Sequence, residues 1–231
     1  MSRLEAAISL VLTLAIAAMA TVFVKREFFP NEPPPPPLPT PEFVETWREL
    51  LPHGTTIGNP EAVVKIIVFS DLQCPNCRRG HEVIRRVQLA NSADVAIVFP
   101  HFPLTTIHQF AMPAAIAAEC ATAGGALEQF LDLAYAQQDS LGIKPWELMA
   151  TEASVESSAA FSACLADSTT RASVAADIAK GKEFEVDATP TLFINGWKYR
   201  GTPPEAVLME LVTRLVKEAV AAPVGINPGA R

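Results

Sequence analysis

The chain has 231 residues, of which 49% are hydrophobic and 19% charged, so it can bury a core and is not mostly disordered despite 20 prolines. The formal charge is -7 and there is no basic run, which argues against nucleic-acid binding. The cysteines at positions 74, 77, 120 and 164 form one close pair and one distant pair.

Residues 6–24 form a 19-residue run without a charged side chain, long enough to cross a bilayer core as a helix. We therefore predict that residues 1–29 are an uncleaved membrane anchor. The alternative is a signal peptide cleaved at Ala18-Met19-Ala20, but the apolar run continues past this site to the full spanning length. Either interpretation sends the rest of the chain to the periplasm or another extracytoplasmic space.

Residues 30–41 read PNEPPPPPLPTP, and consecutive prolines favour an extended polyproline segment with no core of its own. We interpret this segment as a linker that holds the following domain away from a membrane. A docking motif for a proline-binding partner is the alternative. Residues 42–222 are expected to fold as one domain, and residues 223–231 to form a flexible tail.

The domain has an α/β pattern. Apolar runs rich in Val and Ile at residues 62–69 and 95–99 are typical of buried strands, and a helix with one apolar face is expected between them at 77–90. Asn195-Gly196, between TLFI and WKYR, predicts a β-hairpin. Further helices are expected over residues 42–51, 113–120, 126–138, 145–150, 155–165, 171–181 and 203–220.

The close pair, Cys74-Pro75-Asn76-Cys77, directly follows the first predicted strand and opens a helix. The free amides and the dipole of a helix start favour a thiolate at Cys74, and proline suits the first turn. Cys77 lies on the same helix face within disulfide reach, so the pair is predicted to cycle between disulfide and dithiol. Half of a zinc site and an inert bridge are the alternatives. The first lacks a second close cysteine pair, and the second would close almost no loop.

Three stretches of the sequence resemble one known family. SDLQCPNC, the HFPL segment followed by His108, and TPTLFING are similar to the DsbA-like thioredoxin-fold thiol:disulfide oxidoreductases. The resemblance covers residues 58–220, most of the exported part. It implies a thioredoxin fold with an inserted helical domain at about residues 104–184.

The resemblance also implies roles for particular residues. Cys74 matches the family's nucleophile and Cys77 its resolving cysteine. Thr189-Pro190 matches the family's cis-proline, which would expose the Thr189 backbone to a substrate strand beside Cys74.

Two positions bear on how this dithiol would work. Many relatives carry a buried acid on the first strand where this chain has Val68, so the way in which Cys77 ionises is open. Between the cysteines, Pro75 and Asn76 tune the stability of the thiolate, and Asn76 offers only a dipole where a histidine would offer charge. We therefore expect a weaker oxidant than the His-containing relatives, but not a strong reductant.

The distant pair, Cys120 and Cys164, is separated by 44 positions in the predicted helical block. In an oxidising compartment two remaining cysteines usually pair, and we rank a structural disulfide first. Two buried free thiols, or a second redox pair that relays electrons to the dithiol, are the alternatives. The resemblance supports the bridge, because many similar proteins carry cysteines in matching helices.

These observations predict an enzyme, a membrane-tethered protein disulfide oxidoreductase that acts on exported polypeptides with thiols or disulfides and is recharged by a membrane redox partner. A reductase or isomerase recharged by a membrane electron donor is the first alternative. A copper or zinc metallochaperone and a non-catalytic peptide-binding chaperone are alternatives from other classes. We expect no cofactor and no resident metal. We also expect a monomer, because residues 30–57 are too short for the N-terminal dimerisation domain of isomerising relatives.

Overall fold

The computed structural model describes residues 3–28 and 40–221. Most of the predicted linker over residues 30–41 therefore lies outside the described residues, and so does the whole predicted tail over residues 223–231. Both remain predictions from the sequence.

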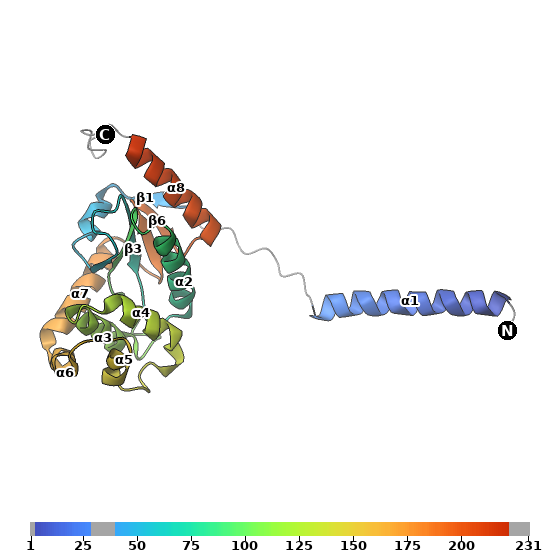
Figure 1. Cartoon of the computed structure of the whole chain (residues 1–231), viewed down its shortest axis with the longest axis horizontal. Coiled ribbons are helices and arrows are strands. Elements are labelled where there is room, and N and C mark those ends of the chain that lie inside the picture. The colour runs from blue at the N-terminus through green and yellow to red at the C-terminus, as the bar shows by residue number, and fades with distance from the viewer. Residues whose placement is uncertain (1–2, 29–39, 222–231) are drawn as a thin grey trace. The chain divides into compact units, whose positions relative to one another are not determined.

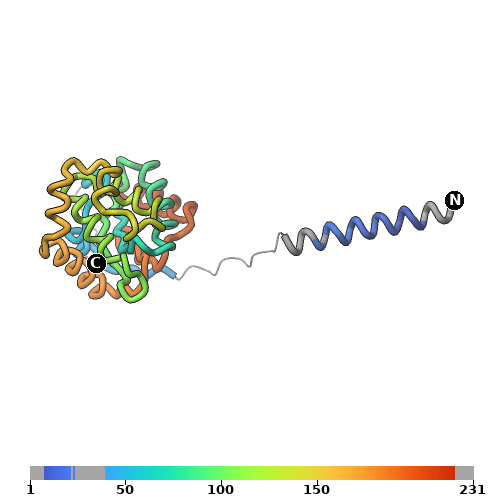
Figure 2. The backbone as a smooth tube through the Cα atoms, turned by 90° about the horizontal axis from the view of Figure 1, so that it is seen from below, coloured from blue at the N-terminus to red at the C-terminus, as the bar shows by residue number. Residues whose placement is uncertain are grey.

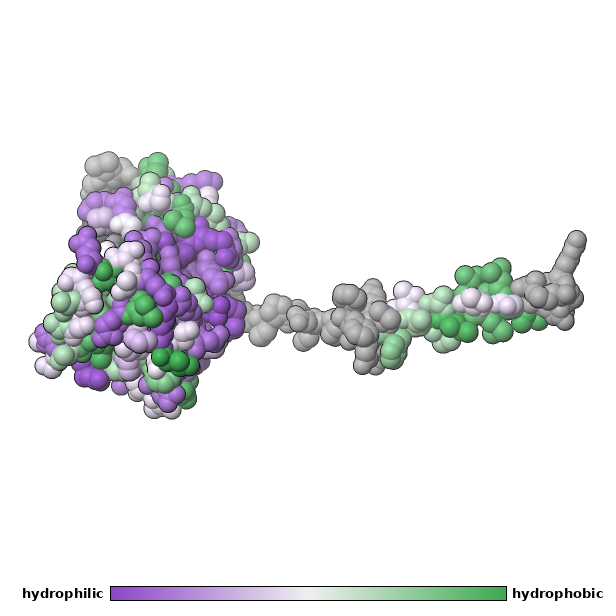
Figure 3. All heavy atoms as spheres, turned by 60° about the horizontal axis from the view of Figure 1, so that its bottom comes forward, coloured by the Kyte–Doolittle hydropathy of each residue, from purple (hydrophilic) through white to green (hydrophobic). Residues whose placement is uncertain are grey.

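Contacts divide the chain into two units, Met1–Leu38 and Pro39–Arg231. In the first unit the uncharged run forms a helix, α1 (Arg3–Phe28), drawn in blue (Figure 1, Figure 2). Its described side chains, at residues 8–21 and 23, are exposed and largely apolar (Figure 3). Among the residues that the structure describes, no helix is both long enough and apolar enough to span a membrane. The anchor remains a prediction from the sequence.

The described part of the second unit is built on a six-stranded mixed sheet with the order β1-β6-β5-β3-β4-β2. β3 (Val64–Phe69) and β4 (Val95–Phe99) are parallel, an arrangement that needs the crossover supplied by α2 (Pro75–Ala90). The other neighbouring strands are antiparallel, and β3 is central and largely buried. The remaining strands are β1 (Glu42–Phe43), β2 (Thr55–Ile57), β5 (Thr191–Ile194) and β6 (Trp197–Arg200).

Helices cover the sheet and one of its ends. α8 (Glu205–Ala221) packs on α2, and Figure 1 shows α3 to α6 grouped at one end of the sheet. The block between β4 and β5 occupies the place predicted for the helical insertion at residues 104–184; its standing as a separate domain remains a prediction. Its helices are α3 (Ala111–Ala123), α4 (Leu127–Ala136), α5 (Trp146–Glu152), α6 (Ser158–Ala166) and α7 (Ser168–Glu183), and the short 3-10 helices are η1 (Glu45–Leu50) and η2 (Gln138–Ser140).

Alternate residues of β3 enter two separate apolar clusters. Ile66 and Val68 belong to the larger cluster, which includes α2, α8 and the helical block. Ile67 and Phe69 belong to the smaller one, together with Trp47 of η1. This alternation follows from the two-residue repeat of a strand. Apolar side chains therefore pack on both faces of β3, just before the dithiol.

The predicted hairpin between β5 and β6 is confirmed. Asn195 and Gly196 both have positive φ angles, 44° and 97°, as the tight turn between two strands requires. The Asn195 side chain also accepts a hydrogen bond from the Lys65 amide at 2.8 Å and donates one to the Val63 carbonyl at 2.9 Å. The turn therefore ties β5 and β6 to the start of β3.

The single helix predicted over residues 42–51 is wrong. Glu42 and Phe43 pair with β6 as an edge strand, the Val44 amide donates to the Gly196 carbonyl at 2.9 Å, and only η1 is helical. The edge strand forms because its partner comes from the far end of the chain, which no local pattern indicates. The three-residue strand β2 was missed for the same reason, whereas the other predicted helices and strands are present with their ends shifted by a few residues.

Candidate dithiol site

Cys74 stands at the junction between the loop after β3 and the first turn of α2. It is the N-cap residue, with extended backbone angles (φ -78°, ψ 122°), and Pro75 occupies the first turn, where a missing amide loses no hydrogen bond. The Cys74 amide donates to the Asp71 carbonyl at 3.1 Å, and the Arg78 amide donates to the Cys74 carbonyl at 3.2 Å. The Cys74 thiol is therefore held at the positive end of the helix dipole.

Cys74 and Cys77 are free thiols with opposite pKa shifts. A hydrogen bond from the Cys77 thiol lowers the pKa of Cys74 from 9.0 to about 5, against the opposing effect of burial. Burial, followed by the bond to Cys74, raises the pKa of Cys77 well above its ordinary value. Cys74 is 6% exposed and Cys77 is 1% exposed. The ionised and more accessible thiol of the pair is therefore Cys74.

Thr189 and Pro190 face Cys74 from the segment before β5, and the peptide bond between them is cis. The Cys74 thiol lies 3.5 Å from the Thr189 carbonyl oxygen. Gly80 of α2 packs against the same segment, where a Cβ would come within 3.4 Å of Pro190 Cγ and 2.3 Å of Thr202 Oγ1. Glycine at this position allows α2 to approach the cis-proline, a constraint that the sequence pattern did not reveal.

Asp71 anchors the loop between β3 and Cys74. Its buried carboxylate accepts hydrogen bonds from the amides of Gln73 (2.7 Å) and Leu104 (2.8 Å), and its Oδ2 lies 2.7 Å from His108 Nδ1, within hydrogen-bond distance. Its own amide donates to Cys77 Sγ at 3.5 Å. Sequence reasoning gave this residue no role, although its position directly after the end of a strand was a usable signal.

Gln138 of η2 ties the helical block to the same loop. Its buried side-chain amide donates to the carbonyls of Leu72 (2.7 Å) and Cys74 (3.0 Å). On the other side of the loop, the Gln73 side chain accepts from the Phe110 amide at 2.8 Å. The backbone on the N-terminal side of Cys74 is therefore positioned by residues that are remote in sequence, and no sequence signal pointed to Gln138.

A cavity of about 10 Å³ lies behind Cys77, roughly the space that one water needs. Val68, which stands where many relatives carry a buried acid, lines this cavity. Ser70, Cys77, His81 and Arg85 supply its polar groups, and the rest of the lining is apolar.

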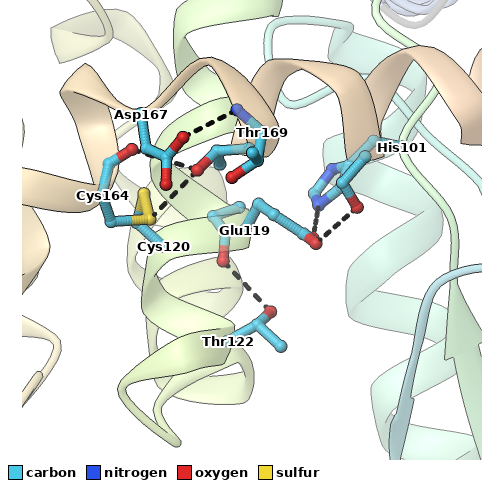
Figure 4. Close-up of a disulfide and its surroundings, with 10 residues drawn as sticks. His101, Glu119, Cys120, Thr122, Cys164, Asp167 and Thr169 are labelled. Carbon is cyan, nitrogen blue, oxygen red and sulfur yellow. Dashed lines mark hydrogen bonds and ion pairs between the residues drawn. A yellow bond between two sulfur atoms is a disulfide. The ribbon is translucent and has the colours of Figure 1, made fainter.

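Cys120 and Cys164 form a disulfide that joins α3 to α6, with an S–S distance of 2.00 Å and a Cα–Cα distance of 5.7 Å (Figure 4). The Thr170 hydroxyl lies 3.4 Å from Cys164 Sγ, and Figure 4 shows Glu119 directed toward the buried His101. The bridge lies within the helical block.

The structure thus brings Cys74, Cys77, Thr189 and Pro190 together at the start of α2. Asn76 is exposed, and its side-chain oxygen accepts a hydrogen bond from the Arg79 guanidinium. Within the described ranges, no cluster of three or more His, Cys, Asp or Glu side chains is arranged to hold a metal ion.

A mixed sheet in which a strand–dithiol–helix unit faces a cis-proline defines a protein of the thioredoxin-fold class. The model of the thioredoxin family matches residues 51–214. The chain belongs to this thioredoxin family.

Solved structures of DsbA-like proteins share the fold. A thioredoxin-like oxidoreductase from Silicibacter pomeroyi is 21% identical with a TM-score of 0.61, and the match covers 76% of this chain and 99% of that one. α-DsbA1 from Wolbachia pipientis is 20% identical with a TM-score of 0.62 (74% and 94%). DsbA2 from Pseudomonas aeruginosa is 25% identical with a TM-score of 0.57 (71% and 94%). The predicted DsbA-like resemblance is confirmed.

Curated relatives are much longer than the region that they share with this chain. The Na(+)/H(+) antiporter NhaA 3 of Salinispora tropica is 33% identical over 145 residues, which make up 62% of this chain and 22% of that protein. NhaA 1 of Salinispora arenicola is 31% identical over 157 residues, 68% of this chain and 24% of that protein. The chain therefore spans about a quarter of the length of these relatives.

Proposed function

We propose that the chain is a membrane-tethered thiol:disulfide oxidoreductase that exchanges disulfides with exported proteins through Cys74-Pro75-Asn76-Cys77. The main support for this proposal is that the pKa of Cys74 is lowered to about 5. This thiol lies at a helix start, opposite the cis-proline segment. A low-pKa thiolate is both a good leaving group and an ionised nucleophile at neutral pH.

The exchange proceeds through a mixed disulfide. A substrate thiolate attacks the sulfur of Cys74 in the oxidised pair, the substrate–Cys74 bond forms, and Cys77 leaves as a thiolate that takes up a proton. A second substrate thiolate then attacks the mixed disulfide and releases the reduced pair. The substrate gains a disulfide and the enzyme gains two electrons, which a membrane redox partner removes. Thr189 next to Pro190 would pair its backbone with the extended substrate strand.

The extracytoplasmic, membrane-tethered setting rests on the uncharged run at residues 6–24 and the proline-rich segment behind it. In this setting the Cys120–Cys164 bridge serves as a structural disulfide of the helical block.

A trapping experiment tests the proposal. Cys77→Ser in the full chain, expressed in an exporting cell, should accumulate disulfide-linked adducts, because a serine cannot resolve them. The matched Cys74→Ser variant should accumulate far fewer adducts, since Cys77 is buried and protonated. If Cys77→Ser shows no adducts above the Cys74→Ser background, the proposed exchange is wrong and thiolate metal binding becomes the better explanation.

The direction of exchange is tested by equilibration with glutathione. An oxidase requires a potential well above the roughly -270 mV of thioredoxin, whereas a value near that figure would favour the reductase alternative. We propose the oxidase because Cys74 is strongly stabilised as a thiolate, which favours the reduced form of the pair.

A further inference from the structure

Each exchange at the dithiol changes the protonation of Cys77, which is neutral in the reduced pair and a thiolate when its bond to Cys74 forms or breaks. Cys77 is 1% exposed, so bulk water has little direct access to it. Val68, on the adjacent strand, offers no proton acceptor. Another group therefore has to exchange this proton.

The cavity behind Cys77 provides the place for that exchange. It has room for about one water, and a buried water needs two to four polar partners. Ser70, Cys77, His81 and Arg85 are the polar residues that its lining offers. Because Cys77 and His81 both line the cavity, a water held there would share it with both side chains.

His81 connects this cavity to the surface. It is four residues after Cys77 on α2, so both side chains share one helix face. Its Nε2 lies 2.6 Å from Asp132 Oδ1, and the side chains of His81 and Asp132 are 12% and 48% exposed. Because Asp132 accepts the Nε2 hydrogen, neutral His81 keeps its free lone pair on Nδ1.

The other groups near Cys77 are poor proton acceptors. The Tyr135 hydroxyl is bonded to Ser70 Oγ at 2.7 Å, and burial raises the pKa of Tyr135 well above its ordinary value. The Asp71 carboxylate is already bound by two amides and His108. Arg85 is a permanent cation. This leaves His81 as the base that lines the cavity.

We propose that His81 is the proton acceptor and donor for Cys77, acting through one water in this cavity, an inference that rests on the proposed function. When Cys77 attacks a mixed disulfide at Cys74, its proton passes to the water while the water gives another proton to His81. The bond between the two cysteine sulfurs forms, and the partner leaves as a thiolate. When a substrate thiolate attacks Cys74 and opens the 74–77 bond, Cys77 leaves as a thiolate and takes a proton from the water, which in turn takes one from protonated His81.

The groups around His81 determine the sign of its pH dependence. Neutral His81 accepts a proton and its cation does not, so the resolution rate should rise with pH until His81 is neutral and then level off. On the outer part of α2, Arg86 is paired with Glu205 of α8. Asp132 and Tyr135 of α4 contact His81, and Cys77 and Arg85 of α2 line the same cavity. Arg85 is in turn paired with Glu128 and Asp132.

The test uses the reduced full chain mixed with glutathione disulfide and quenched with acid at successive times. Mass spectrometry then separates the Cys74–glutathione adduct from the resolved 74–77 disulfide. We expect His81→Asn to form the adduct at the wild-type rate but to resolve it about 10²-fold more slowly at pH 7. Its resolution rate should also keep rising with pH, without the plateau expected of the wild type.

A rescue separates proton transfer from a structural role. Val68→Glu places a carboxylate in the wall of the same cavity, and in the His81→Asn background it should recover much of the resolution rate. Asp132→Asn, half-exposed on α4, should slow resolution less than His81→Asn does. His53→Asn, which alters a histidine outside the cavity lining, is the matched control and should behave as wild type.

An unchanged resolution rate and pH profile in His81→Asn would overturn the inference. Should His81→Asn fail to fold, Asp132→Asn decides, and a wild-type profile there counts against the proposal. Failure of the wild-type chain to form any adduct at Cys74 would instead contradict the proposed function itself.

Discussion

Cys74 is the N-cap residue of α2 and Cys77 lies in the first turn, yet the pKa of Cys74 is lowered to about 5 and that of Cys77 is raised. A thiol whose pKa is lower in the folded state stabilises that state fully above its unfolded pKa. This stabilisation is lost as the pH falls through the folded value, here between about pH 9 and pH 5. The free energy of unfolding of the reduced protein should therefore lose the contribution of the Cys74 thiolate as the pH falls.

Urea unfolding of the reduced wild type and of Cys74→Ala at pH 8, 6.5 and 4.5 checks this prediction. The stability difference between the two proteins should shrink steadily as the pH falls. Asp177, whose pKa burial raises to about 6, titrates in both proteins, so its effect cancels in the difference. A difference that is independent of pH would contradict the assigned thiolate.

Asn76 is the second residue that sets the behaviour of the pair. It is exposed beside the Cys74 thiolate and supplies only an amide dipole. Asn76→His should add a partly charged imidazole, lower the pKa of Cys74 further and make the pair more oxidising. Equilibration with glutathione measures the potential, and Asn76→Gln is the matched control. A potential of Asn76→His equal to that of Asn76→Gln would refute the prediction.

At the scale of elements, the disulfide joins α3 to α6 across a loop of 44 residues. Closing a loop of this length restricts the unfolded chain and stabilises the fold by about 3–4 kcal/mol in the chain-entropy model. The double variant Cys120→Ala/Cys164→Ala should therefore unfold at lower urea while exchanging glutathione disulfide at the wild-type rate. Loss of exchange without loss of stability would favour the electron-relay alternative.

The side chain of Gln138 connects the helical block to the loop before α2 by two hydrogen bonds. Gln138→Leu leaves two buried carbonyls, those of Leu72 and Cys74, without this donor and should cost about 1–3 kcal/mol of stability. Gln137→Leu, at the neighbouring half-buried position, is the control and should cost less. Equal losses of stability in the two variants would mean that the hydrogen bonds of Gln138 to Leu72 and Cys74 contribute no measurable stability.

Elements with strong local patterns could be predicted from the sequence, and those held by remote partners could not. β4, α2 and the Asn195-Gly196 hairpin each carry their own periodicity or turn signal. The edge strands β1 and β2 are two and three residues long and depend on partners elsewhere in the chain. The same holds within the site. The cysteine spacing is visible in the sequence and the family resemblance implies the cis-proline, whereas Asp71 and Gln138 act through residues far along the chain.

At the scale of the whole molecule, the excess apolarity of the chain is concentrated in residues 6–24, and the second unit carries a core of its own. If this run anchors the protein, two aspartates near its middle should prevent stable insertion. Each costs about 3 kcal/mol at the centre of a bilayer. The double variant Leu12→Asp/Ile16→Asp in the full chain should therefore leave the membrane fraction.

Carbonate extraction of broken cells measures the anchoring, and the intact mass of the purified protein shows whether residues 1–20 are still present. The wild type should stay with the membrane at full mass, and Leu148→Asp, a change at an exposed leucine of the second unit, should behave like it. Both variants should keep the glutathione disulfide exchange of the wild type, because the dithiol lies wholly in the second unit. If carbonate releases the wild-type protein and its first 20 residues are missing, the anchor prediction is wrong and residues 1–20 are a cleaved signal peptide. The proline-rich segment would then lie near the N-terminus of a freely diffusing enzyme instead of linking a domain to a membrane.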